Sequence, residues 1–328
     1  MLGDPALRRG GLSGVNSLVP DHASKASGAV QTSRSPLAWP QMGLAHDREL
    51  LDVDWLAAFR RIVGAHRELF EAQSGIAGRT VYEGVGEGGD RALAIDRRAE
   101  EIVFDELSEL HRRGYEFTAI SEERGEVAFG ASGEGAHRVV IDPIDGSLNA
   151  RRTIPAHALS VAVASVPSMA DVEIGYVYDF GTGEEFCARR GQGAELAGAA
   201  LRAEGPGYGL EIVGLEASKP ELILPLVKGL AGKVFRIRAV GSIAISLCYV
   251  AAGRFDGMLC ARPCRSVDAA AAQLIAREAG ASLKFDRLQL SDAPLSLAAR
   301  YVLAAATDEE MLGTLLDVQR AAEADSVS

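Results

Sequence analysis

Two carboxylates lie three residues apart in the segment IDPIDGSLNA, residues 141–150. Asp142 and Asp145 flank Pro143 and directly follow an apolar run that we expect to be a buried β-strand. Because proline fixes φ and has no amide hydrogen, we expect the strand to stop here and the chain to turn between the aspartates. The carbonyl of Ile144 could then face the same cavity as both carboxylates. An Asx-type turn or a helix cap is the alternative interpretation of this pair.

Other acidic residues also follow or precede predicted elements. Glu122 and Glu123 end a strand in AISEERG, and Asp268 begins an Ala-rich helix in RSVDAAAAQLI. Taken singly, they could be a solvated turn and a helix cap. Buried unpaired charges are costly, whereas several carboxylates can share a site that holds divalent cations. Since Mg²⁺ prefers carboxylate, carbonyl, water and phosphate oxygens, the combined set predicts a magnesium site.

The residues after Asp145 predict a place for a phosphate. GSLN has the pattern of a helix start, Gly146 permits close backbone approach, and free N–H groups at a helix start bind anions. Metal-binding carboxylates beside an anion site are the arrangement that phosphoryl chemistry requires.

Hydrophobic periodicity predicts the elements that position these side chains. Residues 53–73 and 94–114 predict amphipathic helices, and strand-like runs follow them. Helices followed by strands indicate an α+β half, residues 46–195, that carries the metal site. Residues 196–328 alternate strands and helices, which predicts an α/β half that completes the metal and substrate site.

The first 45 residues differ in composition from the rest of the chain. Residues 1–45 are rich in Ser, Gly, Ala and Pro and show no sustained periodicity. We therefore predict a disordered N-terminal extension, with the folded part opening near Met42.

Bulk properties exclude several classes of partner. The net charge is −11, which argues against a nucleic-acid-binding surface. No run of 18 apolar residues is present, so we expect no membrane partner. The four cysteines show no paired zinc-like spacing and are expected to be free thiols in a reducing cytoplasm.

Three segments resemble the signature segments of the inositol monophosphatase family: SEE, DPIDGSLN and VDAAAAQLIAREAG. The resemblance covers roughly residues 50–323 and is strongest to the archaeal-type bifunctional fructose-1,6-bisphosphatase/inositol-1-monophosphatase branch. It implies a layered αβαβα sandwich, dependence on two or three Mg²⁺ ions, and a homodimer.

The resemblance also implies roles for individual residues. The metal ligands would be Glu122, Asp142, the Ile144 carbonyl, Asp145 and Asp268. Ser147, hydrogen-bonded to Asp96, would orient a metal-activated water for attack on phosphorus. Backbone N–H groups of Gly146 and Ser147 would hold the phosphate.

The substrate is less well determined by the sequence. Where inositol phosphatases have an acidic residue that grips sugar hydroxyls, this chain has Ala261, with Arg262 and Arg265 close by. A guanidinium near the site would favour a second phosphate through bidentate contacts, although ordinary surface arginines remain the alternative. Arg238 and Ser242 are weaker candidates for the substrate pocket.

The predicted function is therefore hydrolysis of phosphate monoesters of small sugars or polyols by a metal-activated water. The expected substrates are fructose 1,6-bisphosphate, inositol 1-phosphate or both. The alternatives are a 3′-phosphoadenosine 5′-phosphate phosphatase and a non-catalytic binding homologue with the same fold.

Overall fold

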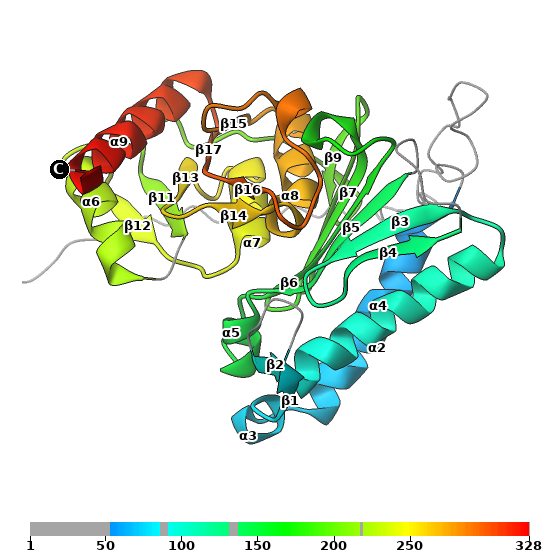
Figure 1. The fold of residues 1–328 in the computed structure, drawn as a ribbon. Coiled ribbons are helices and arrows are strands. Elements are labelled where there is room, and N and C mark those ends of the chain that lie inside the picture. Colours follow the sequence, from blue (N-terminus) through cyan, green and yellow to red (C-terminus); the bar gives the residue numbers. More distant parts are fainter. Residues whose placement is uncertain (1–52, 86–90, 131–136, 217–218, 328) are drawn as a thin grey trace, which may run out of the picture. The chain divides into compact units, whose positions relative to one another are not determined.

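A computed structural model describes residues 53–85, 91–130, 137–216 and 219–327, which belong to one compact unit (Figure 1). The extension that we predict for residues 1–45 lies outside the described residues.

The two long amphipathic helices of the first half form as predicted. Helix α2 spans Trp55–Ala72 and helix α4 spans Ala94–Arg112. The side chain of Asp54 caps α2 by accepting a hydrogen bond from the amide of Ala57 at 3.1 Å. The two helices pack against each other and cover one face of a large sheet (Figure 1).

That sheet has eight strands in the order β10-β9-β8-β7-β6-β5-β3-β4. Of its described pairs, β3 and β5 run parallel and the others run antiparallel. The strands are β3 (Phe117–Ser121), β4 (Gly125–Phe129), β5 (Arg138–Asp145), β6 (Ala158–Ala164), β7 (Val172–Asp179), β8 (Glu184–Arg189), β9 (Gly193–Leu196) and β10 (Ala199–Leu201).

A second sheet of five strands has the order β12-β11-β13-β17-β15. Its strands are β11 (Ile212–Glu216), β12 (Arg236–Arg238), β13 (Gly257–Cys260), β15 (Ser282–Phe285) and β17 (Leu303–Ala306). The remaining α-helices and strands of the described residues are α3 (Ile76–Arg79), β1 (Tyr82–Val85), β2 (Arg91–Leu93), α5 (Ser147–Arg151), α6 (Pro220–Leu230), α7 (Ile243–Ala251), β14 (Cys264–Arg265), α8 (Ser266–Glu278), β16 (Arg300–Tyr301) and α9 (Glu309–Val327).

The helices and sheets form five layers. Helices α7 and α8 lie between the two sheets and contact strands of both, while α6 and α9 pack on the outer face of the five-stranded sheet (Figure 1). With α2 and α4 outside the eight-stranded sheet, the order is αβαβα. The predicted layered sandwich is confirmed, whereas its division into halves at residue 195 stays a prediction.

The expectation that β5 stops at Pro143 is wrong. Strand β5 continues to Asp145, and its register against β6 shifts between Asp142 and Asp145. Asp142 pairs with Ser160 and Asp145 with Ala158, so three steps on β5 match two on β6. The extra residue is a β-bulge, which accommodates the proline without ending the strand.

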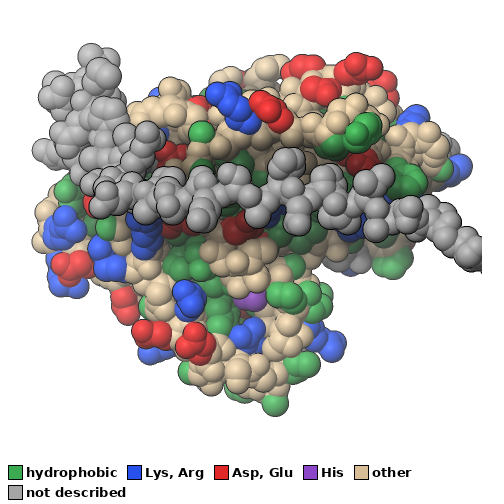
Figure 2. Space-filling model, turned by 180° about the vertical axis from the view of Figure 1, so that it is seen from behind, with side chains coloured by type: hydrophobic (Ala, Val, Ile, Leu, Met, Phe, Trp, Pro, Cys, Tyr) green, Lys and Arg blue, Asp and Glu red, His purple; other side chains and the backbone are tan. Residues whose placement is uncertain are grey.

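The distribution of surface charge and the state of the cysteines agree with the expectations from the net charge and the cysteine spacing. On the face seen in Figure 2, basic and acidic side chains of the described residues are interspersed and form no continuous basic stripe. The four cysteines are free and buried. No helix among the described residues has both the length and the apolar character needed to cross a membrane.

Candidate active site

Three carboxylates from three different elements meet at one end of β5. Glu122 lies in the turn between β3 and β4, Asp142 lies in β5, and Asp268 lies in the first turn of α8. One oxygen from each lies within 4.8 Å of the others. Hard oxygen donors at this spacing fit a divalent cation such as Mg²⁺, so the predicted convergence of these residues is present in the structure.

The bulge in β5 explains why a fourth carboxylate belongs to this region. In a regular strand, residues three apart point to opposite faces of the sheet. The extra residue allows Asp142 and Asp145 to face the same side, where each carboxylate raises the pKa of a neighbouring one. Burial, followed by Glu122 and Asp145, raises the pKa of Asp142, and burial with Asp268 raises the pKa of Asp145 to about 7.

Asp145 differs from the other three carboxylates because it is tied to the start of α7. Its Oδ2 accepts hydrogen bonds from Ser242 Oγ and from the amide of Ala244, both at 2.6 Å. Ser242 Oγ in turn accepts from the amide of Ile245 at 3.1 Å and caps α7. Ser242 is buried, so the structure places this predicted substrate residue against a carboxylate.

Arg265 contacts two members of the acidic cluster. Its Nη1 donates to Glu122 Oε1, and its Nε lies 3.6 Å from Asp268 Oδ1. Its amide donates to Asp268 Oδ2 at 2.8 Å, which fixes the aspartate at the start of α8. The guanidinium therefore lies against the acidic cluster and is part-buried. Arg238 differs, because it is exposed on the edge strand β12 and donates to the carbonyl of its neighbour Ile237 at 2.9 Å.

A pocket next to the cluster brings Asp96 and Ser147 together. Its lining includes these two residues with Glu122, Asp142 and Ile144. Asp96 Oδ1 is buried without a hydrogen-bond partner among the described residues. Burial, Glu123 and Glu122 raise the pKa of Asp96 to about 7. The predicted bond between Asp96 and Ser147 is not formed, but the unpartnered oxygen is available to a hydroxyl or a water.

Gly146 makes the sharp connection from β5 to α5. Its φ is 87°, in the left-handed region that favours glycine. A Cβ at this position would lie 2.8 Å from the carbonyl oxygen of Ala156. The glycine is therefore required for the close backbone approach that sets Ser147 at the first position of α5.

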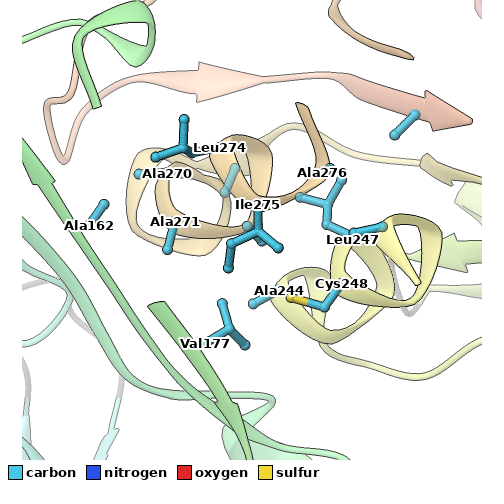
Figure 3. Close-up of a cluster of buried hydrophobic side chains, with 14 of the residues drawn as sticks. Ala162, Val177, Ala244, Leu247, Cys248, Ala270, Ala271, Leu274, Ile275 and Ala276 are labelled. Carbon is cyan, nitrogen blue, oxygen red and sulfur yellow. The ribbon is translucent and has the colours of Figure 1, made fainter. Parts of the chain in front are cut away.

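Helix α8 holds Asp268 rigidly between the sheets. All residues from Ser266 to Ala276 are buried. Figure 3 shows the short side chains of Ala270 and Ala271 between Ala162 on the sheet side and α7. Alanines allow this close approach of the helix and the sheet, and they explain the Ala-rich sequence of the segment.

Two buried glutamates were not predicted from the sequence. Glu216 ends β11 and accepts hydrogen bonds from the amides of Val240 and Gly241 at 3.0 and 2.8 Å and from Ser246 Oγ at 2.6 Å. It thereby holds the segment that leads to Ser242. Its position at a strand end is the same signal that identified Glu122, whereas Glu100, in the middle of α4, gives no such signal.

Comparison with known proteins identifies the family of this chain. The model of the inositol monophosphatase family matches residues 49–323, most of the chain. The chain belongs to the inositol monophosphatase family. It is accordingly a phosphatase, a hydrolase of phosphate monoesters, and sugar phosphates are its substrate class.

Individual members of the family are similar over most of their length. The fructose-1,6-bisphosphatase/inositol-1-monophosphatase of Methanothermobacter thermautotrophicus is 34% identical over 241 residues, which cover 69% of this chain and 82% of that protein. The Nus factor SuhB of Escherichia coli is 35% identical over 202 residues, 58% of this chain and 70% of that protein. A solved inositol monophosphatase–fructose 1,6-bisphosphatase superposes with a TM-score of 0.70 at 28% identity, covering 81% of this chain and 100% of that one.

Proposed function

We propose that this member of the inositol monophosphatase family is a Mg²⁺-dependent phosphatase of fructose 1,6-bisphosphate, inositol 1-phosphate or both. The observation that carries the proposal is the convergence of Glu122, Asp142 and Asp268 within 4.8 Å. Relatives whose names give both activities, at 31–34% identity, support this choice of substrates.

Different residues of the chain would bind the metal ions and the phosphate. Glu122, Asp142 and Asp268, with Asp145 and the Ile144 carbonyl, would hold two or three Mg²⁺ ions. Bound Mg²⁺ would polarise the ester and neutralise charge on the leaving oxygen. The backbone N–H groups of Gly146 and Ser147 would bind the phosphate.

Asp96 and Ser147 would handle the attacking water. The unpartnered Asp96 Oδ1 lies at the pocket that Ser147 also lines, so it can accept a proton from the hydroxyl or from a water. Burial is the largest cause of the raised pKa of Asp96, and it favours the uptake of a proton by this carboxylate. We propose that this pair orients the water for in-line attack on phosphorus.

Phosphate release from both substrates, measured side by side with Mg²⁺ and with EDTA, tests the proposal. We expect turnover only with Mg²⁺ and none in the variant Asp142→Asn. The control is Asp317→Asn, an exposed aspartate on α9 that pairs with Arg320 and should retain full activity. Turnover that resists EDTA would refute the metal role, and retained Mg²⁺ binding without turnover would favour the non-catalytic homologue.

Arg265 is the proposed reader of a second phosphate. Its guanidinium already contacts Glu122 and Asp268, so replacing it changes the metal region for every substrate. The informative quantity is therefore the ratio of kcat/KM for the bisphosphate to kcat/KM for the monophosphate at saturating Mg²⁺. We expect Arg265→Ala to lower this ratio and the exposed Arg320→Ala to leave it unchanged. Equal losses on both substrates would remove the second-phosphate role.

A further inference from the structure

The turn that carries Glu122 is held at both ends by one buried glutamate of helix α4. Glu100 Oε1 accepts a hydrogen bond from Ser121 Oγ at 2.5 Å and another from the amide of Arg124 at 3.1 Å. Ser121 and Arg124 are the residues immediately before and after the Glu122–Glu123 pair. The acidic pair therefore lies between two anchors that share a single acceptor.

The turn itself is short, which makes these anchors effective. Ser121 pairs with Gly125 across the hairpin, so residues 122–124 form a three-residue loop. Gly125 has a φ of 74°, the left-handed conformation that such loops use at their end. A loop of this length has few alternative conformations once both ends are fixed, so its anchors determine where Glu122 points.

A second contact connects the turn to α4. Arg124 Nε lies 3.3 Å from Glu100 Oε2, and its guanidinium carbon lies 4.4 Å from the ring centre of Phe104, one helical turn after Glu100. Glu100 is only 2% exposed, so its carboxylate depends on these partners for its hydrogen bonds. The same helix also carries Asp96 one turn earlier, at the pocket.

We infer that Glu100 is a positioning residue that sets the place of Glu122 relative to Asp142 and Asp268, and so sets the affinity for the divalent cation. This inference rests on the proposed function, because it concerns the same carboxylates. Glu100 contacts neither the cluster oxygens nor the pocket in the described part of the chain. Removing a hydrogen-bonding partner of a metal ligand typically changes metal affinity 10–100-fold, and this is the scale we take for Glu100, which acts on Glu122 through Ser121 and Arg124.

The central test is direct Mg²⁺ binding by isothermal titration calorimetry on the full chain. We expect Glu100→Ala to raise the Kd for Mg²⁺ about 10–100-fold. We expect kcat at saturating Mg²⁺ to stay near the wild-type value, because no group that touches the substrate is changed. Glu100→Gln keeps an acceptor oxygen for Ser121 and for the Arg124 amide and loses the ion pair, so its Kd should lie between those of Glu100→Ala and the wild type.

A matched control comes from the same helix. Glu106 of α4 accepts hydrogen bonds from Arg61 Nε at 3.1 Å and Nη2 at 2.5 Å, away from the turn. Glu106→Ala also breaks a glutamate–arginine pair, here between α4 and α2, so it should lower the melting temperature without changing the Kd for Mg²⁺. If Glu100 only stabilised the fold, Glu100→Ala would likewise lower the melting temperature and leave the Kd for Mg²⁺ unchanged. Equal Kd values for the two Ala variants would therefore overturn the inference.

Ser121→Ala decides the question if Glu100→Ala does not fold. It removes one anchor of the turn while Glu100 keeps Arg124 as a partner, so the Kd should rise by less than in Glu100→Ala but measurably. A wild-type Kd in Ser121→Ala would overturn the inference. If the wild type binds no Mg²⁺, the proposed function fails together with this inference. If the wild type binds Mg²⁺ and hydrolyses sugar phosphates while all variants bind equally, this inference fails alone.

Discussion

Carboxylates buried together oppose folding unless a cation joins them. Glu122, Asp142 and Asp268 come from sequence positions far apart, and burial raises the pKa values of Glu122 and Asp142. Perturbed acids that share a cleft are typical of functional sites. These three residues are predictable from sequence, because each follows an apolar strand or begins an apolar helix. A carboxylate at such a position is costly to bury unless it has a partner.

Other residues of the site cannot be found in this way. The contact of Ser242 with Asp145 joins residues almost a hundred positions apart, and Glu100 is one of many glutamates on an exposed-looking helix. Their roles depend on which element packs where. Local patterns therefore identify the proposed metal ligands, whereas the residues that would orient them are found only in the three-dimensional structure.

Replacing Ser147 by Ala should lower kcat by about 10²–10⁴, the usual contribution of a positioned acid–base partner. Ser147 is exposed at the start of α5, so the free energy of unfolding should change by only about 0.5 kcal/mol. Steady-state kinetics and urea unfolding of the same preparation check both expectations. The exposed Ser291→Ala should leave kcat unchanged, and an unchanged kcat in Ser147→Ala would remove the hydroxyl from the mechanism.

At the scale of elements, the periodic helices and the strands of both sheets follow from the sequence, but the bulge does not. A proline in a strand predicts an interruption, and only the pairing of β5 with β6 shows that one extra residue is absorbed instead. The position of α8 is similar, because its alanines predict a buried helix without showing which sheet it contacts.

The packing of α8 makes a sharp prediction for Gly175 of β7. A Cβ at Gly175 would lie 2.5 Å from the carbonyl oxygen of Ala271. Gly175→Ala should therefore push the helix away, lower the free energy of unfolding by about 1–3 kcal/mol and weaken Mg²⁺ binding through Asp268. Gly64→Ala is the matched substitution. A Cβ at Gly64, inside α2, would meet no atom within 4 Å beyond the backbone of its own helix, so this change should raise the free energy of unfolding by about 0.5–1 kcal/mol. Chemical unfolding measures the free energy of unfolding of each variant, and calorimetry measures its Mg²⁺ binding. A Gly175→Ala variant as stable as Gly64→Ala would contradict the close packing of α8 on β7.

A buried histidine makes the α2–α4 contact sensitive to pH. His66 Nε2 donates to the carbonyl of Ala99 at 2.9 Å, and Nδ1 is buried without a partner among the described residues. Burial lowers the pKa of His66 to about 4, against about 6.5 in the unfolded chain. The neutral ring therefore supports folding fully above pH 6.5, and this contribution is lost as the pH falls towards 4.

His66→Gln should remove this part of the pH dependence. Between pH 7.5 and pH 5.0, the wild type should lose about 1–2 kcal/mol more unfolding free energy than the variant does. Urea unfolding of both proteins in EDTA at the two pH values measures this difference. The contributions of the carboxylates that the two proteins share cancel when the variant is subtracted from the wild type. Parallel losses would show that His66 does not titrate in this range.

At the scale of the whole molecule, the resemblance of three short segments predicts the five layers, which composition alone does not give. Repulsion among the clustered carboxylates should lower the free energy of unfolding of the metal-free protein. Mg²⁺ at 100 times its Kd should raise the free energy of unfolding by about 2.7 kcal/mol for one site. NaCl of equal ionic strength should not replace it.

Asp142→Asn is the control for this effect and should abolish it. Without the carboxylate, Mg²⁺ should no longer raise the melting temperature. In EDTA the variant should melt above the wild type, because one of the mutually repelling buried charges is gone. Thermal unfolding with and without Mg²⁺ tests both statements, and a variant that melts lower in EDTA would show that the cluster carries no repulsion.

The place of α8 between the sheets also has a consequence for synthesis of the chain. Translation proceeds from the N-terminus, and parts of a chain can begin to fold as they emerge. Glu122 and Asp142 leave the ribosome long before Asp268, and until then the eight-stranded sheet lacks the packing of α8 against β5, β6, β7 and β8. The nascent protein therefore cannot complete its acidic cluster until Asp268 has been synthesised and α8 has packed against the sheet.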